Sequence, residues 1–369
     1  MDGIAVVDGA TGTPRWRVER SGELPGGDGA HLADGVNLEP GRFWRLPLVD
    51  IDGSWAVVVG YVIDAADTSM DPEYGIAALA AADGHMVWKR PVRVAGPPTV
   101  GHSTNWVDTV LTDGHTVFVT AFMGSMERIS MERMPDADRL RATKLLAVDG
   151  RTGEALWEDM GVSPLAIADD VVAGFGPGTT AANADIPETV GVLLDKATGE
   201  PLPYRFDRHP WVRPVEAAGN VAVLLAGTDD DRSVVGDLVL VDLADGSELA
   251  VLGSGGRGGA GTCDSDGALI ACAVEDTSTD EMHLATYDTA SGSGAFAAAG
   301  EWHELTIHAV WHDGVLSTMG VGNQSTQVLD LAGKVVQDLP GYFMAASDEF
   351  VVMRSVSVST DYAVYRVTG

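Results

Sequence analysis

The chain has 369 residues, and its 23 Lys or Arg against 54 Asp or Glu give a formal net charge of −31. This charge excludes a general nucleic-acid binder, because phosphate contacts need clustered basic side chains, and it argues against docking on an anionic membrane surface. A hydrophobic content of 45% excludes intrinsic disorder, and 45 glycines indicate many turns.

The first residues, Met1 to Ala5, lack the charged and apolar regions of a signal peptide and are typical of the inside of a strand. We therefore expect either an excised domain or a misassigned start. No apolar run approaches the roughly 18 residues that a membrane span requires, so we expect no direct membrane insertion by this chain.

A turn motif, Asp-x-x-Thr-Gly followed four residues later by Trp, recurs along the chain. It spans Asp8 to Gly12 with Trp16, and Asp149 to Gly153 with Trp157. A weaker copy at 82–84 has Trp88, and copies without Trp lie at 195–199, 242–246, 288–292 and 330–333. The anchoring glycines, at 12, 84, 153, 199, 246, 292 and 333, are 72, 69, 46, 47, 46 and 41 residues apart. A period near 46 is therefore lengthened by two long insertions in the first two units.

Short apolar runs flank each motif, which predicts a β-hairpin around it. Runs before the motif include 4–7, 145–148, 192–194 and 238–241. Between the motifs lie further strand pairs, with turns centred near 52, 113, 169, 219, 266, 313 and 348. Four short strands in each period of roughly 40 to 50 residues are the arrangement of a β-propeller blade. No window has sustained helical periodicity.

The motif resembles the repeat of the PQQ-like, or quinoprotein dehydrogenase-like, β-propellers. The resemblance is clearest at Val7 to Trp16 and Val148 to Trp157, and the spaced copies cover essentially the whole chain. The later copies keep Asp and Gly but have Pro203, Ala250, Phe296 and Gln337 at the Trp position. This departure leaves the predicted all-β fold unchanged and weakens any argument from a complete ring of docked tryptophans.

Seven first hairpins and seven second hairpins predict seven four-stranded blades in one domain, residues 1–369. The chain begins on a second hairpin and ends on a first hairpin plus the strand 362–367. We therefore expect the N- and C-terminal strands to pair and close the ring, which removes an exposed edge. The strand 362–367 competes with 4–7 for one place, and eight blades are the alternative if residues precede Met1.

Insertions at 20–41, 64–74 and 123–143 indicate which face of the propeller binds. With strands labelled a to d from the axis outward, propellers of this kind place d–a and b–c connections on one face. Nearly all long segments are of that type, including 176–189 and 228–236, whereas the a–b and c–d turns are short. We predict that a protein partner or small ligand binds the d–a/b–c loop face. Simple tolerance of insertions is the alternative.

The segment 123–143 combines methionines with the densest group of arginines in an acidic chain. Methionines adapt to contact surfaces and also fill irregular gaps, so a binding segment and a short amphipathic helix that covers a blade both remain open. The candidate binding residues are Met123, Met126, Arg128, Met131, Arg133 and Met134.

The resemblance also provides a criterion for catalysis, since quinone-dependent enzymes of this family have an adjacent Cys–Cys disulfide, a calcium ion and a catalytic Asp. Cys263 and Cys272 are nine residues apart, so no quinone site can be transferred to this sequence. We therefore expect no PQQ and no catalytic residue. The two cysteines flank the turn Asp264 to Gly267 and are opposed if that turn sets the pairing. A cross-strand disulfide and two buried free thiols both fit, with the disulfide slightly favoured.

The remaining clusters do not predict a strong metal site. His308 and His312 would lie about 13 Å apart on a strand, too far to share an ion. We therefore interpret them, together with His303, as polar positions on a half-solvated strand. The acidic stretches 229–231 and 276–281 could hold calcium weakly, but they lack the spacing of a calcium loop and are better explained as solvated loop tips.

The sequence thus favours a non-catalytic propeller that acts as a binding, scaffold or sensor module. Its place in an extracytoplasmic, envelope-associated protein is implied by the resemblance alone, and a cytoplasmic location stays open. The alternatives are a quinone-dependent dehydrogenase with a degenerate site and a carbohydrate-binding or hydrolysing propeller. Trp44, Trp106 and Trp211, near the loop face, would be consistent with the carbohydrate alternative.

Overall fold

The computed structural model contains β-strands and no helix among the residues that it describes. The described residues are 3–8, 11, 13–19, 22–26, 28–33, 47–64, 72–92, 104–124, 143–167, 170–177, 189–202, 212–226, 236–243, 247–254, 263–276, 281–296, 305–311, 313–319, 325–346, 350–354 and 362–366. Within these ranges no helix is long and apolar enough to cross a bilayer. The chain divides into two compact units, Met1–Pro164 with Gly174–Leu202, and Leu165–Ala173 with Pro203–Gly369.

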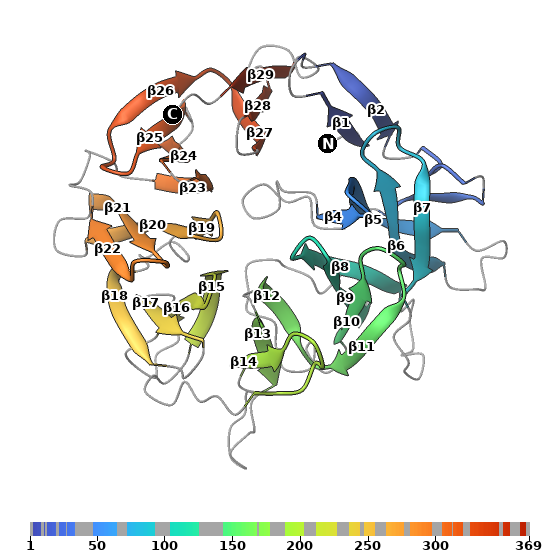
Figure 1. The fold of residues 1–369 in the computed structure, drawn as a ribbon, viewed down its shortest axis with the longest axis horizontal. Helices are drawn as coiled ribbons and strands as arrows, with labels where there is room; N and C mark the ends of the chain where they lie inside the picture. The colour runs from blue at the N-terminus through green and yellow to red at the C-terminus, as the bar shows by residue number, and fades with distance from the viewer. Residues whose placement is uncertain are drawn as a thin grey trace. The chain divides into compact units, whose positions relative to one another are not determined.

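The first unit contains three antiparallel sheets in chain order (Figure 1). A two-stranded sheet has β1 (Gly3–Val7) and β2 (Pro14–Glu19). The second sheet has β3 (Ala30–Leu32), β4 (Leu48–Ile51), β5 (Ser54–Ile63), β6 (Glu73–Ala80) and β7 (Met86–Pro91). The third has β8 (Thr104–Thr112), β9 (Thr116–Gly124), β10 (Thr143–Asp149) and β11 (Ala155–Met160). Next in the chain, β12 (Ser163–Ile167), β13 (Val171–Pro177) and β14 (Thr189–Asp195) form a three-stranded sheet, extended by a bridge between Leu194 and Pro201.

The second unit continues the same meander. Its first four strands are β15 (Val212–Ala218), β16 (Val221–Ala226), β17 (Asp237–Asp242) and β18 (Glu248–Ser254). The next four are β19 (Cys263–Ser265), β20 (Leu269–Asp276), β21 (Glu281–Asp288) and β22 (Ser293–Phe296), and a single pair, Ser254 with Glu275, links the two groups. Two sheets follow. The first has β23 (Leu305–Trp311), β24 (Gly314–Met319), β25 (Ser325–Asp330) and β26 (Val335–Leu339). The second has β27 (Tyr342–Ala346), β28 (Phe350–Arg354) and β29 (Tyr362–Arg366).

The predicted hairpins are confirmed, except that a single bridge stands in place of the second strand after the motif at 195–199. The seven first hairpins are the turns β4–β5, β8–β9, β12–β13, β15–β16, β19–β20, β23–β24 and β27–β28. The motif copies fall between β1 and β2, β6 and β7, β10 and β11, β17 and β18, β21 and β22, and β25 and β26, and the copy at 195–199 falls between β14 and the bridge at Pro201. The prediction of an all-β chain with four-stranded antiparallel sheets is therefore correct. The count of seven blades and the closure of a ring stay predictions.

One insertion differs from its prediction as a connecting loop. Within 20–41, Ala30 to Leu32 form β3, which pairs with β5 beside β4. Ala30 and Leu32 are buried and His31 between them is not, the alternation of a half-buried strand. The first strand of this sheet is thus in two pieces, because the chain leaves it after Leu32 and returns at Leu48. The insertion 64–74 begins directly after β5 and the insertion 123–143 follows β9, and the strands β6, β9 and β10 extend one or two residues inside the predicted limits.

The motif turns form because Asp binds the backbone amides that follow it. Asp149 Oδ1 accepts hydrogen bonds from Arg151 N at 2.9 Å and Thr152 N at 2.8 Å, and Asp195 repeats the arrangement with Ala197 and Thr198. The hydrogen bond from the Thr198 side chain, together with those from the backbone, holds the pKa of Asp195 below its ordinary value. These local hydrogen bonds explain why Asp, Thr and Gly recur at this spacing.

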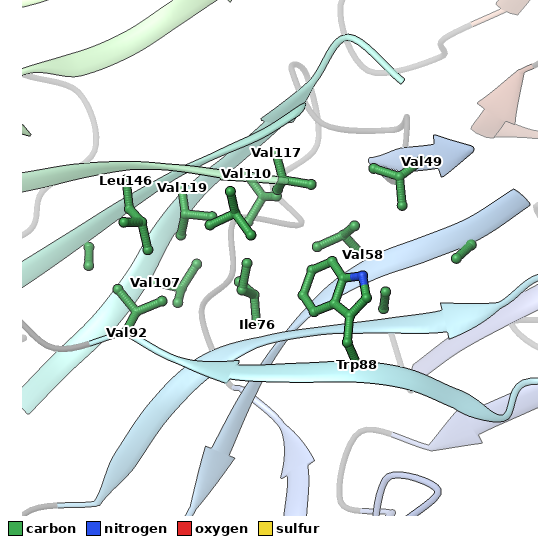
Figure 2. Close-up of a cluster of buried hydrophobic side chains, with 14 residues drawn as sticks. Val49, Val58, Ile76, Trp88, Val92, Val107, Val110, Val117, Val119 and Leu146 are labelled. Carbon is green, nitrogen blue, oxygen red and sulfur yellow. The ribbon is translucent and has the colours of Figure 1, made fainter. Parts of the chain in front are cut away.

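Hydrophobic cores lie between consecutive sheets of a unit. One cluster joins Val49, Val58 and Ile76 of the second sheet to Val107, Val119 and Leu146 of the third (Figure 2). Its members are mostly Val and Ala, whose small branched or short side chains fit the closely packed faces of sheets. Trp88 belongs to the same cluster and is only 8% exposed.

Candidate binding surface

Most of the predicted binding residues lie outside the described residues. Met123 is in β9, one residue before the strand ends. The other five candidate binding residues lie outside the described residues: Met126, Arg128, Met131, Arg133 and Met134. The same holds for four residues and one stretch of the other predictions: Trp44, Trp211, His303, His312 and 229–231. Trp106 lies in β8. The loop-face prediction therefore stays a prediction, and the candidate surface below is built from described residues.

The three motif tryptophans dock on the next turn along the chain. Trp16 Nε1 donates to Ala81 O at 3.1 Å, Trp88 Nε1 to Gly150 O at 2.7 Å, and Trp157 Nε1 to Lys196 O at 2.9 Å. Each indole also lies against the next motif glycine: a Cβ at Gly84, Gly153 or Gly199 would come within 3.0, 2.9 or 2.5 Å of the ring. These glycines have φ values of 79°, 74° and 73°. Glycine is thus required both by the backbone and by the docked ring.

The hairpin between β4 and β5 has a fixed backbone in the first unit. Asp52 and Gly53 both have positive φ, 53° and 83°, as a two-residue type I′ turn requires, and Asp50 Oδ1 accepts a hydrogen bond from Gly53 N at 2.7 Å. On one side Asp50 N donates to Gly114 O at 2.8 Å, and on the other Trp55 O accepts from Ala81 N at 2.9 Å. The neighbouring turns therefore hold this hairpin from both sides.

Two large apolar side chains are exposed on this fixed hairpin. Trp55 is 54% exposed and Leu48 is 43% exposed. The pairings of Asp50 with Trp55 and of Leu48 with Val57 place Leu48, Asp50 and Trp55 on one face of the sheet. We call these three residues the Trp55 patch. An exposed aromatic side chain on a rigid backbone is typical of a protein-binding anchor, because binding orders little of the chain.

Sequence reasoning missed the Trp55 patch. The hairpin centred near residue 52 was predicted, but no exposed residue was assigned to it. The available signal was the Trp itself, which follows the Asp52-Gly53-Ser54 turn in the position where the β8–β9 hairpin has Thr116. Trp55 is the second residue of β5, directly beside the turn, whereas Ala56 and Val57, which lie on opposite faces of the strand, are both buried.

A second series of exposed apolar residues lies on the fourth strands of the sheets. Val87, Leu156, Leu249 and Val336 each stand three residues after a motif glycine and are 38, 53, 41 and 58% exposed. Each is the extra residue of a β-bulge; for example, Ala147 pairs with Trp157 and Val148 with Ala155, which leaves Leu156 unpaired. Bulges twist an edge strand and prevent further strands from adding to it. We therefore interpret this series as edge protection.

The turn carboxylates are suited to electrostatic attraction and not to proton transfer. Arg15 and Thr11 bind Asp8 and lower its pKa to about 2, and the His85 side chain lowers the pKa of Asp83. Carboxylates with lowered pKa values stay ionised at neutral pH, whereas a general acid needs a raised pKa. Asp52 near the Trp55 patch lies 3.8 Å from Arg151. Among the described residues, no three His, Cys, Asp or Glu side chains gather as metal ligands.

His308 and the cysteines lie in the second unit. The His308 ring hydrogen-bonds Thr318 Oγ1 through Nε2 at 2.9 Å, and burial lowers its pKa to about 4. His308 and Thr306 are half-buried and alternate with buried Leu305 and Ile307, as expected of the predicted strand position. Cys263 and Cys272 are directly paired across β19 and β20 and form a disulfide, which resolves the alternatives left open by the sequence in favour of the bridge.

The repeated four-stranded meander, with each tryptophan docked on the following turn, defines a β-propeller fold. No family model and no curated protein matches the sequence. Among solved structures, the chain is similar to BamB from Moraxella catarrhalis, with 12% identity, 92% of this chain and 98% of that chain covered, and a TM-score of 0.43.

Two further similar structures come from Pyrococcus. The β-propeller domain of the Trilobed protease from Pyrococcus furiosus is 13% identical, with 88% of this chain and 98% of that chain covered and a TM-score of 0.46. The acylaminoacyl peptidase of Pyrococcus horikoshii is 15% identical, with 88% and 51% covered and a TM-score of 0.47. Because these likenesses are weak, the fold assignment rests on this chain's own strand order and docking contacts.

Proposed function

We propose that this chain is a non-catalytic propeller that binds a protein partner, and that the Trp55 patch is one anchor of the interface. The observation that carries the proposal is the exposure of Trp55 and Leu48 on a hairpin whose backbone is hydrogen-bonded on both sides. A buried aromatic side chain cannot contact a partner, and a mobile one must be ordered on binding. An exposed aromatic side chain on a fixed backbone avoids most of this entropic cost.

The charge around the patch suggests the chemistry of the partner. Asp50 belongs to the patch, Asp52 adjoins it, and the whole chain has a net charge of −31. A partner segment with an apolar or aromatic side chain beside Lys or Arg complements this surface, since the cation would meet the carboxylates while the apolar group covers Trp55. The cation could also lie over the indole face.

The wider assignment is also a proposal. We propose PQQ-like repeats, supported by the docking of Trp16, Trp88 and Trp157, in one propeller domain over 1–369 that requires no PQQ and holds calcium weakly at most. The loop face with Met126 and Met131 is proposed as a second binding surface. An extracytoplasmic, envelope-associated location is supported by the disulfide, because disulfides persist in oxidising compartments.

Selection of binding peptides tests the proposal. A random peptide display library is selected on the immobilised full chain, and the enriched peptides are measured against Trp55→Ala and Leu48→Ala variants. We expect apolar–basic sequences that lose at least about tenfold in affinity with Trp55→Ala, the usual loss for an interface anchor. Leu156→Ala is the matched control, since Leu156 is equally exposed but lies on a bulged edge. Unchanged peptide affinity in Trp55→Ala, or equal losses of affinity in Trp55→Ala and Leu156→Ala, would refute this site.

A further inference from the structure

The three-residue strand β19 binds three different strands of the second unit. Cys263 is covalently joined to Cys272 of β20. The next residue, Asp264, accepts a hydrogen bond through Oδ2 from Val310 N of β23 at 3.0 Å. Ser265 donates through Oγ to Ala217 O at 3.3 Å and to Glu216 Oε1 at 3.4 Å, both on β15. Figure 1 shows β19 between β15 and β23.

These hydrogen bonds reach the edges of two neighbouring sheets. Among the described strands, β15 and β23 each stand at the end of a strand order, and no described strand pairs with the backbone groups on their outer side. The Asp264 carboxylate supplies an acceptor for one such amide, and the Ser265 hydroxyl supplies a donor for one such carbonyl. The side chains of β19 therefore couple the first strands of three successive four-stranded groups, of which the first two are linked by one strand pair.

Apart from the disulfide and the side-chain hydrogen bonds of Asp264 and Ser265, a short ladder holds β19 in place. It pairs with β20 at three positions, Cys263 with Cys272, Asp264 with Ala271, and Ser265 with Ile270. The disulfide spans nine residues of sequence, and such a short loop constrains the unfolded chain less than a long one. The main effect of the disulfide is therefore to fix the position of β19 against β20.

The two cysteine residues differ in burial. Cys272 is fully buried in the core of the second unit, whereas Cys263 is half-buried on the edge strand. Thiol–disulfide exchange requires that an attacking thiolate reach one sulfur, and access decides which sulfur reacts. The burial of Cys272 directs attack to Cys263.

We propose that the Cys263–Cys272 disulfide is a redox modification site, reduced by a dithiol, that controls the coupling between these three groups of strands. A thiolate of the dithiol attacks Cys263 Sγ, the Sγ–Sγ bond breaks, and Cys272 leaves as a thiolate that takes up a proton. The second thiol of the reductant then displaces Cys263, and the reductant becomes a disulfide, so two electrons and two protons pass to the cysteines. With the bond open, β19 loses its one covalent link to β20, and three backbone pairs remain between the two strands, so Asp264 and Ser265 are positioned less firmly.

Hydrogen–deuterium exchange of the full chain, oxidised and after dithiothreitol, tests the coupling. We expect peptides of β19 and β23 to exchange about tenfold faster after reduction, as the loss of a charge-assisted hydrogen bond implies, while β9 and β10 of the first unit do not change. The oxidised Asp264→Ala variant should reproduce the faster exchange in β23 alone. A change confined to 263–265, or an equal change throughout the chain, would overturn the proposal.

Alkylation tests the route of attack. In the folded Cys272→Ser variant, iodoacetamide should modify Cys263, whereas in the folded Cys263→Ser variant Cys272 should react only after denaturation. Equal reactivity of the two thiols, or faster reaction of Cys272, would refute the assignment of Cys263 as the attacked sulfur. Circular dichroism of both variants shows whether the all-β fold is retained.

Discussion

Substitution of Gly153 by Ala separates the docking of Trp88 from the backbone requirement of the turn. Gly153 has a φ of 74°, and an L-residue in that region costs about 1–2 kcal/mol. The added Cβ would also lie 2.9 Å from the Trp88 ring, closer than atoms can approach, so the ring must shift. Trp88 is buried in its cluster and donates to Gly150 O at 2.7 Å. Losing that hydrogen bond costs about 1 kcal/mol, and forced repacking adds about 1 kcal/mol or more.

The matched control is Gly114→Ala. Gly114 has a φ of 91°, and an added Cβ there would meet nothing within 4 Å. The Gly114→Ala variant therefore has the same unfavourable positive φ for Ala but no contact between the new Cβ and a tryptophan. We expect Gly153→Ala to lower the free energy of unfolding by about 2 kcal/mol more than Gly114→Ala, from the hydrogen-bond and repacking terms together.

Urea unfolding followed by tryptophan fluorescence and circular dichroism measures both variants. The excess should shrink when Gly153→Ala is combined with Trp88→Leu, because the ring that the Cβ contacts is then absent and the two effects are coupled. Equal losses for the two glycine variants, or full additivity with Trp88→Leu, would show that the docking contact contributes nothing to stability.

Three further predictions concern pH, the loop face and the cofactor. Burial lowers the pKa of His308 from 6.5 to about 4. The neutral ring therefore contributes about 3 kcal/mol to the free energy of unfolding above pH 6.5. This contribution is lost as pH falls toward 4, because the unfolded chain takes up the proton at a higher pH than the folded chain. Urea midpoints at pH 7 and 4.5 should therefore converge in His308→Gln, and an unchanged pH dependence would contradict this origin. Changing Met126 and Met131 to Asp should abolish partner binding at the loop face without lowering the melting temperature; a large drop in melting temperature would instead identify the segment as core cover. Addition of PQQ with Ca²⁺ should leave absorbance and tryptophan fluorescence unchanged, and quenching at stoichiometric PQQ would favour the quinone-dependent alternative.

Local chemistry made the hairpins predictable. Asp149 and Asp195 bind amides two and three residues away, so their spacing can be recognised without knowing the fold. The cysteine pairing was accessible for the same reason, because a short hairpin sets the register of Cys263 and Cys272. Contacts between residues that are close in the sequence can therefore be predicted from the sequence alone.

The contacts between sheets were less accessible. Trp88 meets Gly150 and Gly153 more than sixty residues later, and only a family resemblance suggested such docking. The strand β3 has three residues, too few for its alternation to be recognised in a segment rich in Gly. Both faces of β5 are buried from Ala56 onward, so the exposure of Trp55 depends on how far the neighbouring sheets extend toward the turn, and the desolvation of His308 depends on what packs around β23. Both are properties of tertiary packing that periodicity does not reveal.

The interrupted first strand of the second sheet has an evolutionary consequence. Ala33 N donates to Gly60 O at 3.1 Å where the chain leaves the sheet, and Val58 N donates to Pro47 O at 2.8 Å where it returns. The departure and return are thus fixed on two nearby residues of β5, and the sheet keeps its register on both sides. Chain length between these two points can change without altering the sheet, since loop closure costs little more for longer loops. This position is a ready-made insertion point, at which new recognition segments can be gained, exchanged or grafted while the propeller scaffold stays the same.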